Sequence, residues 1–243
     1  YDGLWDPYNN FHMGNAGELC ASECNITRQD QDEFAIMSYK RALEAQKNGW
    51  FDNEIVPVKI QDRKGEIIID KDEEPGKINF DKVTSLKAVF KKDGTVTAAN
   101  ASSIDDGASC VIVASDEKAK ELGAKPLAKI IAYATHAQQP EWFTTAPAEA
   151  IKKCSQKAGI KIEDIDLFEI NEAFSSVPIV TSRLLNIPYE KININGGAVS
   201  LGHPIGQSGS RILTTLIFAL KRTNKKYGMA SLCIGGGEAV AMI

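Results

Sequence analysis

The chain has 243 residues, of which 43% are hydrophobic and 25% charged, and its formal net charge is −4. These values are typical of a globular protein with one large or two smaller domains, and they argue against a mainly disordered chain. Acidic residues slightly outnumber basic ones, so we do not expect nucleic acid as a partner. No apolar stretch approaches the ~20 residues of a membrane-spanning helix, so we do not expect a membrane partner either.

The cysteines and the first residue bear on the environment of the chain. The five cysteines match no zinc-binding spacing, and their odd number argues against a disulfide framework. We therefore expect no metal site and a reducing compartment. The chain begins at Tyr1, without an initiator Met or a signal-peptide pattern, so we expect a processed chain or a piece of a longer protein.

The first 93 residues are mostly irregular in pattern and contain one clear helix signal. Thr27 is followed by Asp30, and a short polar side chain before an acidic first turn predicts a helix start. Asn48-Gly49 predicts the end of that helix. Three further segments are predicted here, namely short strands at 55–60 and 66–69 and a charged surface loop at 70–77 that ends in a Pro-Gly turn.

From Asp93-Gly94 onward, predicted strands and helices alternate. The expected strands are 95–100, 110–114, 127–134, 165–170, 192–194, 228–234 and 238–243, and the expected helices are 116–122, 147–158, 173–185 and 208–222. This alternation predicts a layered α/β unit with a mainly parallel sheet and right-handed crossovers. Polar clusters follow three of the strands, and ligands of open α/β sheets usually bind at such strand ends.

The first polar cluster is Asn171-Glu-Ala-Phe174, directly after the predicted strand 165–170. By itself, an Asn in this place caps the following helix more often than it takes part in catalysis. Its amide could also hold a water molecule or an oxyanion at the end of the strand. The residues of this cluster leave both roles open.

The second cluster is the glycine-rich segment 195–211, between a predicted strand and an apolar helix. Glycines permit positive φ angles and close backbone approach, but neither phosphate-loop spacing is present. His203 is the one titratable imidazole among these glycines. A structural hydrogen bond and a catalytic role are equally open for it, since the small neighbours would give a substrate access.

The third cluster is Cys233-Ile-Gly-Gly-Gly237, between the last two predicted strands. A buried strand cysteine is normally an inert small hydrophobic residue. At a strand end followed by glycines, backbone amides can face an anion and favour a thiolate. If Cys233 and His203 meet in space, the pair could perform nucleophilic or acid/base chemistry.

The three clusters, taken together and in this order, resemble the thiolase family. Tyr1-Asp-Gly-Leu4 and His12-Met-Gly14 look like the start of the family's substrate loop, and 94–102 with Asp106-Gly107 looks like its return strand. The Glu73–Gly76 loop is most similar to that of the cytosolic, biosynthetic acetoacetyl-CoA thiolases. The resemblance implies a thiolase-like layered βαβαβαββ fold, with the C-terminal half complete and the N-terminal half truncated.

The resemblance also implies the domains and the reaction. A remnant of the substrate-binding loop domain would span 1–93, the tail of the N-terminal half 94–122, and the C-terminal half 123–243. Thiolases join two acetyl-CoA molecules into acetoacetyl-CoA and CoA, or run the reverse cleavage, so CoA thioesters are substrates and no cofactor is expected. The family suggests homodimers or homotetramers, a cytoplasmic or organellar location, and a place in lipid metabolism such as the mevalonate pathway.

Six residues receive roles by their positions in the family's motifs. His203 would activate the nucleophilic cysteine and polarise the thioester carbonyl, and Asn171 would hold the water of the same oxyanion site. Cys233 would be the acid/base, and the Gly235 amide would serve a second oxyanion site. Two further residues are implied to line the channel for the CoA pantetheine, namely His12 and Ser102.

The chain departs from the family pattern in two ways. The acyl-carrying cysteine of thiolases precedes the His-Met-Gly segment, so we expect it to be missing and the chain to be inactive alone. Cys20 and Cys24 on one predicted helix, Cys154 on another, and Cys110 are interpreted as structural or incidental. The second departure concerns a cation site. The mitochondrial branch of the family has a Tyr in the Glu-Glu loop and a Tyr-Ala-Ala stretch, whereas this chain has Pro75-Gly76 and Ala-Glu-Ala at 148–150. A bound potassium ion is therefore not expected.

Two other functions compete with a thiolase. A β-ketoacyl synthase shares the fold, but such enzymes pair their nucleophile with two His, or His and Asn, and lack a Cys-x-Gly-Gly segment near the end. A CoA- or acyl-binding module without catalysis is the alternative outside enzymes. A product too truncated to fold belongs to the same alternative. Both are favoured by the expected absence of half the core, which would leave apolar sheet edges exposed.

Overall fold

The computed structural model describes residues 2–63 and 65–243; Tyr1, assigned above to the substrate loop, lies outside the described residues. The helices are α1 (Met13–Glu23), α2 (Arg28–Lys47), α3 (Asp116–Glu121), α4 (Ala146–Ala158), α5 (Ser176–Leu185), α6 (Ala198–Leu201) and α7 (Ser208–Thr223). The strands are β1 (Trp5–Asp6), β2 (Phe11–His12), β3 (Val58–Asp62), β4 (Gly65–Ile69), β5 (Tyr133–Ala137), β6 (Leu167–Ile170), β7 (Gly228–Ile234) and β8 (Glu238–Met242). Short 3₁₀ helices cover Glu74–Lys77, Phe80–Ser85, Pro140–Trp142, Ile162–Asp164 and Tyr189–Lys191.

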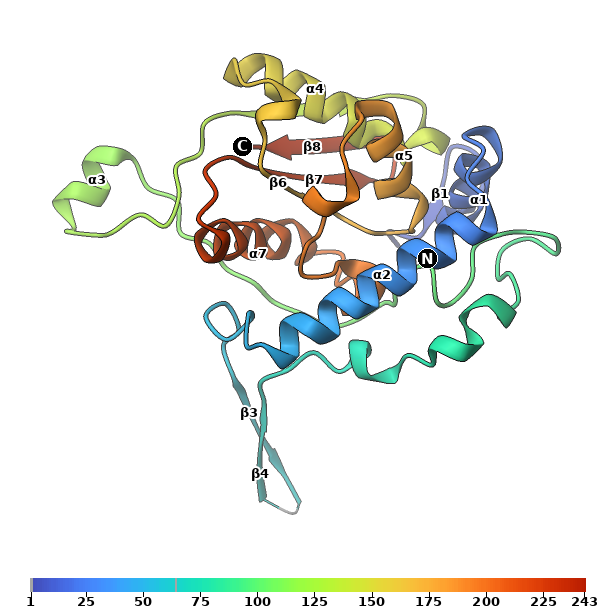
Figure 1. Ribbon diagram of the computed structural model, residues 1–243, viewed down its shortest axis with the longest axis horizontal. Coiled ribbons are helices and arrows are strands. Elements are labelled where there is room, and N and C mark those ends of the chain that lie inside the picture. Colours follow the sequence, from blue (N-terminus) through green and yellow to red (C-terminus); the bar gives the residue numbers. More distant parts are fainter. Residues whose placement is uncertain (1, 64) are drawn as a thin grey trace.

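One four-stranded sheet forms the centre of the molecule, with the strand order β5-β8-β7-β6 (Figure 1). The expectation of a mainly parallel sheet is wrong, because only β6 and β7 run parallel, while β8 is antiparallel to both of its neighbours. The tight turn at 235–237 joins β7 directly to β8, and a hairpin connection imposes antiparallel pairing. The predicted strand 192–194 is reduced to one parallel bridge between Phe168 and Ile192.

Helices cover the two faces of this sheet unequally. On β7, Met229 packs in the cluster that includes α4, and the next residue, Ala230, packs in the cluster that includes α7. Since successive strand residues point to opposite faces, α4 and α7 lie on opposite sides. The α7 face is covered over β6 and β7 but keeps an apolar hollow of about 390 Å³ over β5 and β8, lined in part by Val240 and Met242.

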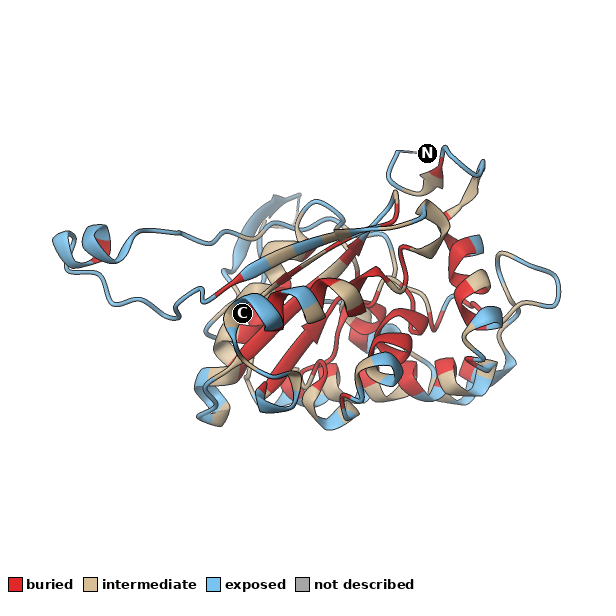
Figure 2. Cartoon of the chain, turned by 90° about the horizontal axis from the view of Figure 1, so that it is seen from above, coloured by how far each residue is buried: buried red, intermediate tan, exposed pale blue. Residues whose placement is uncertain are grey.

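Besides 192–194, two other predicted strands do not form. Thr95 and Val96 donate their backbone amides to the Glu18 carboxylate instead of to a neighbouring strand. The segment 110–114 is extended but unpaired, and Ile112 is 94% exposed. This segment leads to α3, which projects away from the body in both views (Figures 1 and 2). An apolar run becomes a strand only where a partner strand accepts its hydrogen bonds.

The N-terminal part contains more helix than its pattern indicated. The helix predicted between Thr27 and Asn48 is confirmed as α2, with a reciprocal capping box between Thr27 and Asp30. Helix α1, which contains Cys20, begins where the Nδ1 of His12 accepts the Gly14 amide at 3.0 Å. The hairpin of β3 and β4 lies close to its predicted place and projects from the body (Figure 1).

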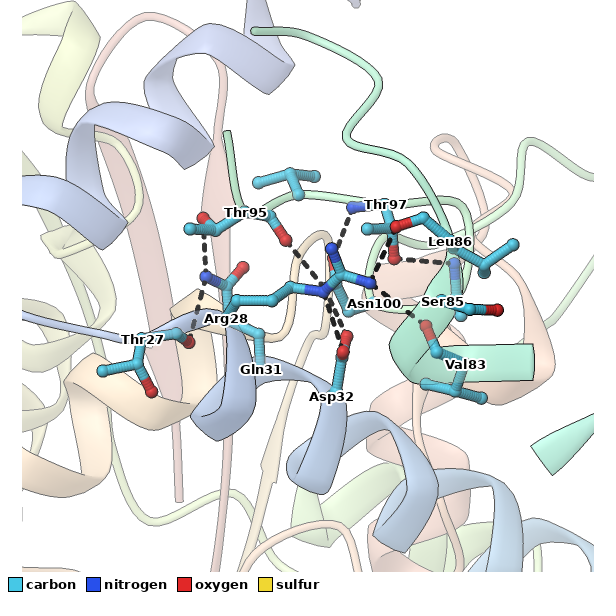
Figure 3. A network of polar contacts seen from close by, with 12 residues as sticks. Thr27, Arg28, Gln31, Asp32, Val83, Ser85, Leu86, Thr95, Thr97 and Asn100 are labelled. Carbon is cyan, nitrogen blue, oxygen red and sulfur yellow. Dashed lines mark hydrogen bonds and ion pairs between the residues drawn. The ribbon is translucent and has the colours of Figure 1, made fainter. Parts of the chain in front are cut away.

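A buried polar network fastens α2 to the segments that follow it (Figure 3). Arg28 pairs with Asp32 at 2.7 Å and donates to the carbonyls of Val83 and Leu86. Asn100 donates to the other carboxylate oxygen of Asp32 at 2.9 Å. These bonds hold the 80–100 region on α2, so that residues 101 and 102 reach Ala173 and Phe174, in the segment that follows β6.

Within the described residues, the helices fall short of the length and apolar character that crossing a membrane requires. The same part of the chain brings together no group of three or more His, Cys, Asp or Glu side chains suited to a metal ion.

Candidate active site

The three polar clusters lie at one edge of the sheet. Strands β6 and β7 are parallel, so their carboxyl ends meet at the same edge. Asn171 follows β6 directly, and its backbone amide donates to the backbone carbonyl of Ser231 on β7 at 2.9 Å. Cys233 and the turn 235–237 come at the end of β7. The glycine-rich segment reaches this edge through His203.

Asn171 and His203 are in contact, with 3.4 Å between Nδ2 and Nε2. The capping role left open for Asn171 is wrong, because α5 begins only at Ser176, with Ser175 as its cap residue. Asn171 is 1% exposed, and its Oδ1 is buried with no hydrogen-bond partner among the described residues. An unsatisfied buried amide oxygen is costly, so this side chain is suited to hold a group that enters the site.

Ser208 fixes the orientation of the His203 ring. Its Oγ lies 2.6 Å from Nδ1 and also donates to the Pro204 carbonyl at 3.1 Å. A carbonyl oxygen only accepts, so the one hydroxyl proton of Ser208 is directed to Pro204. Both contacts are satisfied together only if His203 carries its proton on Nδ1. The Nε2 lone pair then faces the Asn171 amide and the site.

The imidazole of His203 is held in its neutral form. Burial, and secondarily the charge of Arg211, lower the pKa of His203 to about 4. At neutral pH, Nε2 is therefore a free base able to take a proton from an incoming thiol. The backbone amide of His203 donates to the Ser103 carbonyl at 3.0 Å, which fixes the loop itself.

Cys233 is a protonated thiol in this structure. It is 9% exposed, and burial raises its pKa to about 12, although a backbone hydrogen bond acts in the opposite direction. The expectation that amide dipoles favour a thiolate here is wrong, because the cost of desolvating the charge is larger. Cys233 packs in the cluster on the α4 side of the sheet, and in the described chain it forms no hydrogen bond with His203 or Asn171.

The turn after Cys233 requires glycine. Gly236 and Gly237 have φ angles of +100° and +89°, and a Cβ on Gly237 would lie 2.2 Å from the Gln138 carbonyl oxygen. A Cβ on Gly235 would lie 3.0 Å from Cε of Met13. The start of α1 therefore lies against this turn, which brings its cap residue, His12, to the same region.

Ser102 contacts the Asn171–Phe174 segment directly, and His12 is linked to it through Phe90. The His12 ring stacks on Phe90 with centroids 4.8 Å apart, and Phe90 meets Phe174 edge-on at 6.3 Å. Ser102 donates its hydroxyl to the Ala173 carbonyl at 2.9 Å. Near His203, residues 105–109 and 204–207 line an open hollow of about 300 Å³. The structure thus gathers the six predicted residues around one sheet edge.

Two residues that support the site were not predicted from the sequence. One is Ser208; a hydroxyl five residues after a loop histidine, at a helix start, is the signal that could have indicated it. The other is Glu172, a fully buried carboxylate that accepts from Ser38, Asn193 and the Val199 amide at 2.8–3.0 Å. Burial raises the pKa of Glu172. Through Val199 it holds α6, which leads into the His203 loop.

Comparison with known protein families identifies the chain over nearly its whole length. The model described as "Thiolase, N-terminal domain" matches residues 1–117, and "Thiolase, C-terminal domain" matches residues 124–243. A probable acetyl-CoA acetyltransferase of Dictyostelium discoideum is 54% identical over the whole chain, which covers 59% of that relative. An acetyl-CoA acetyltransferase of Yarrowia lipolytica is also 54% identical, with 60% of its length covered.

Solved structures agree with these relatives. The chain superposes with a TM-score of 0.95 on the acetyl-CoA acetyltransferase of Bacillus anthracis, at 44% identity, over 98% of this chain and 61% of that one. Human mitochondrial 3-ketoacyl-CoA thiolase gives the same TM-score and the same two coverages at 38% identity. The chain therefore spans about 60% of the length of the relatives it matches.

Proposed function

The chain belongs to the thiolase family and has its α/β fold, and on this premise we propose that it is part of an acetyl-CoA C-acetyltransferase. The reaction would be the condensation of two acetyl-CoA molecules to acetoacetyl-CoA and CoA, or its reverse. The observation that carries the proposal is the contact of a neutral His203 with Asn171 beside the Cys233 turn. The names of relatives that are 54% identical support the same reaction.

Each residue has a role that its surroundings support. His203 takes the proton of the acyl-carrying thiol through Nε2 and, once protonated there, donates to the thioester oxygen beside the water held by Asn171. Cys233, kept protonated by burial, first gives its proton to the departing CoA sulfur. The thiolate that this leaves then takes a proton from the acetyl methyl carbon of the second acetyl-CoA, which restores the thiol. The Gly235 amide faces the second oxyanion, and His12 and Ser102 line the pantetheine channel.

We propose that the acyl-carrying cysteine belongs to the part of the relatives' length that this chain does not match. Cys20 and Cys154 are fully buried in the core, Cys24 ends α1, and Cys110 is exposed on the 110–114 segment. None of these four forms a hydrogen bond with His203 in the described structure. Alone, the chain would bind CoA thioesters without turning them over. The uncovered apolar hollow on the α7 face is where additional polypeptide would pack.

Several further expectations remain predictions about the complete protein. They are the use of CoA thioesters without another cofactor, assembly as a homodimer or homotetramer, a cytoplasmic or organellar location, and a place in the mevalonate pathway. The domain boundaries at 93 and 122 are also predictions. Residue 122 falls in the interval between the two matched family models, at 118–123.

The test is to fuse the part of a relative that this chain does not match to this chain and to measure acetoacetyl-CoA cleavage. We expect turnover in the fusion and none in the chain alone. His203→Ala and Cys233→Ala should abolish turnover, whereas His136→Ala, a histidine on β5, and Cys110→Ser should not. Full turnover in His203→Ala would refute its role. CoA binding by a fusion that never turns over would favour the binding-module alternative.

A further inference from the structure

Arg211 occupies a central position among buried charges behind the site. Its guanidinium lies 3.7 Å from the Glu169 carboxylate, with the arginine side chain 17% exposed and the glutamate 2%. Neither Nη1 of Arg211 nor Oε2 of Glu169 has a hydrogen-bond partner in the described structure. The guanidinium of Arg211, on α7, is thus largely buried without the short charge-assisted hydrogen bonds that usually join a buried arginine to a carboxyl group.

The architecture places the Arg211–Glu169 contact in the layer next to the Asn171–His203 contact. Glu169 and Asn171 are two residues apart along β6 and its continuation, so they point to the same face of the sheet. Ser208 and Arg211 are three residues apart on α7, so they lie on the same face of the helix. Two layers result, with Asn171, His203 and Ser208 in one and Glu169 and Arg211 in the next.

The charge of Arg211 is only partly compensated. Four carboxyl groups sense it, and burial raises the pKa of all four: Glu54, Asp72, Glu169 and Glu172. Burial raises the pKa of Glu169 to about 8, so this carboxyl remains largely protonated at neutral pH. The charge of Arg211 is therefore only weakly balanced by Glu169, and after burial it is the second cause that lowers the pKa of His203. On the loop side, Asp105 is bound by Ser103, whose carbonyl accepts the His203 amide.

We propose that Arg211 is a positioning residue whose charge, one helical turn behind Ser208, adds to the effect of burial on His203 and keeps its Nε2 free to accept a proton down to a lower pH. The importance of Arg211 for catalysis rests on the function proposed above. The physical reason is that a fixed cation in a partly buried site disfavours a second positive charge nearby. A neutral imidazole can take the proton of a thiol, whereas an imidazolium cannot.

The test is a nuclear magnetic resonance titration of His203 in this chain, which needs no turnover. Only three histidines are present, and His203→Asn identifies the signal. Arg211→Met should raise the pKa of His203 on the order of 1 unit, as expected for removing one nearby charge. Arg211→Lys keeps the charge and should leave the pKa low. If the parent unfolds in acid before His203 titrates, the pH of unfolding is an upper bound on the pKa of His203 in the parent. The pKa of His203 in Arg211→Met must then lie above that pH.

Two further variants separate charge from folding. Arg211→Met with Glu169→Leu removes both members of the pair and fills the space with apolar groups, a replacement that buried pairs often tolerate. It should raise the pKa of His203 as Arg211→Met does. Arg222→Met is the matched control, because Arg222 is also on α7 but lies over Trp50 and bonds Asn195. It should leave His203 unchanged.

The outcomes are distinct from those that test the reaction. An unchanged His203 pKa in both variants lacking Arg211 would overturn the inference, as would an equal rise in Arg211→Lys. If the inference holds and the fusion enzyme is active, Arg211→Met should move the acid limb of its rate profile upward by the same amount. If the fusion is inactive while the titration behaves as expected, the proposed function fails and the role of Arg211 in setting the charge of His203 remains.

Discussion

The hydroxyl of Ser208 holds the ring of His203 through a contact of 2.6 Å between Oγ and Nδ1. The same oxygen donates to the Pro204 carbonyl, so Nδ1 must be the protonated nitrogen. One side chain on the first turn of α7 therefore determines both the orientation and the tautomer of the imidazole. Its removal should be visible in His203 itself.

Ser208→Ala should release the Nδ1 proton from its acceptor and allow a mixture of tautomers. We expect the ¹⁵N shifts of the two ring nitrogens of His203 to approach each other, since each nitrogen would be protonated part of the time. In the fusion enzyme, kcat should fall on the order of 10-fold, within the range of general acid–base contributions.

Ser210→Ala is the matched control for this variant. Ser210 also lies on the first turn of α7, but its hydroxyl donates to the Gln207 carbonyl and contacts Ser109. Its loss should leave the nitrogen shifts of His203 in place. Equal changes in the two variants would mean that the helix start, rather than the Ser208 hydroxyl, orients the ring.

Gly236 and Gly237, the two glycines with positive φ in the turn after β7, should differ in how well they tolerate substitution by alanine. Gly236→Ala has open space around its Cβ and should cost only backbone strain, about 1–2 kcal/mol in the free energy of unfolding. Gly237→Ala meets the same strain and also the Gln138 carbonyl oxygen at 2.2 Å, so it should cost clearly more. Urea unfolding of both variants measures the difference, and equal losses would contradict the clash.

The cysteines should be alkylated in an order set by burial and hydrogen bonding. A hydrogen bond from the Cys20 thiol, aided by Arg183, lowers the pKa of Cys24 to about 7. Iodoacetamide should therefore label Cys24 with a midpoint near neutral pH, while Cys233 should stay unlabelled until the chain unfolds. Peptide mass spectrometry across a pH series reads both rates.

Cys20→Ala is the informative variant for that experiment. It removes the hydrogen bond and should move the Cys24 midpoint upward, toward the ordinary thiol value of about 8.5. Exposed Cys110 serves as the internal reference for reagent and pH. A Cys24 midpoint that does not respond to Cys20→Ala would show that the Cys20 thiol plays no part.

Buried carboxyls should make the protein less stable as the pH rises. Burial raises the pKa of Glu169 to about 8 and that of Glu54 to about 7, from 4.5 in the unfolded chain. Between these values the folded state keeps protons that the unfolded state has lost, so the free energy of unfolding falls as pH increases through this window. Glu169→Gln resembles the protonated form and should remove part of that fall.

Urea unfolding at about pH 5 and about pH 8 measures this slope for the parent and the variant. The parent should be the less stable at the higher pH, and Glu169→Gln should narrow the difference. Glu163→Gln, in the 3₁₀ helix before β6 and with an exposed side chain, is the control and should keep the parent's slope. An unchanged slope in Glu169→Gln would place its ionisation outside this range.

Elements with local causes could be predicted from the sequence. Helix α2 begins at Thr27 because the Thr27–Asp30 capping box lies within one turn, and α4 ends at Gly159 because glycine accepts a φ of +66°. The predicted strands 95–100 and 110–114 failed for the opposite reason. Their backbone groups would need partner strands, and no local residue specifies whether those exist.

The site was predictable in place but not in its electrostatics. Asn171 follows β6 and Cys233 lies at the end of β7, so the sequence could indicate their convergence at one edge. His203 reaches the same edge from the loop after α6 and not from a strand. The neutral His203 and the protonated Cys233 result from burial by residues distant in the chain, which no spacing records. Ser208 escaped notice because its bond to His203 depends on how the loop folds back onto α7.

The position of β8 has a consequence for biosynthesis. Residues 238–242 lie between β5 and β7, so the strand that comes latest in the chain occupies an interior place in the sheet. While the ribosome is still making this region, β5 and β7 cannot be joined, and the Cys233 turn lacks its second arm. Until those five residues are in place, β5 and β7 each present an unpaired edge, and such edges expose an incompletely folded chain to association with other chains.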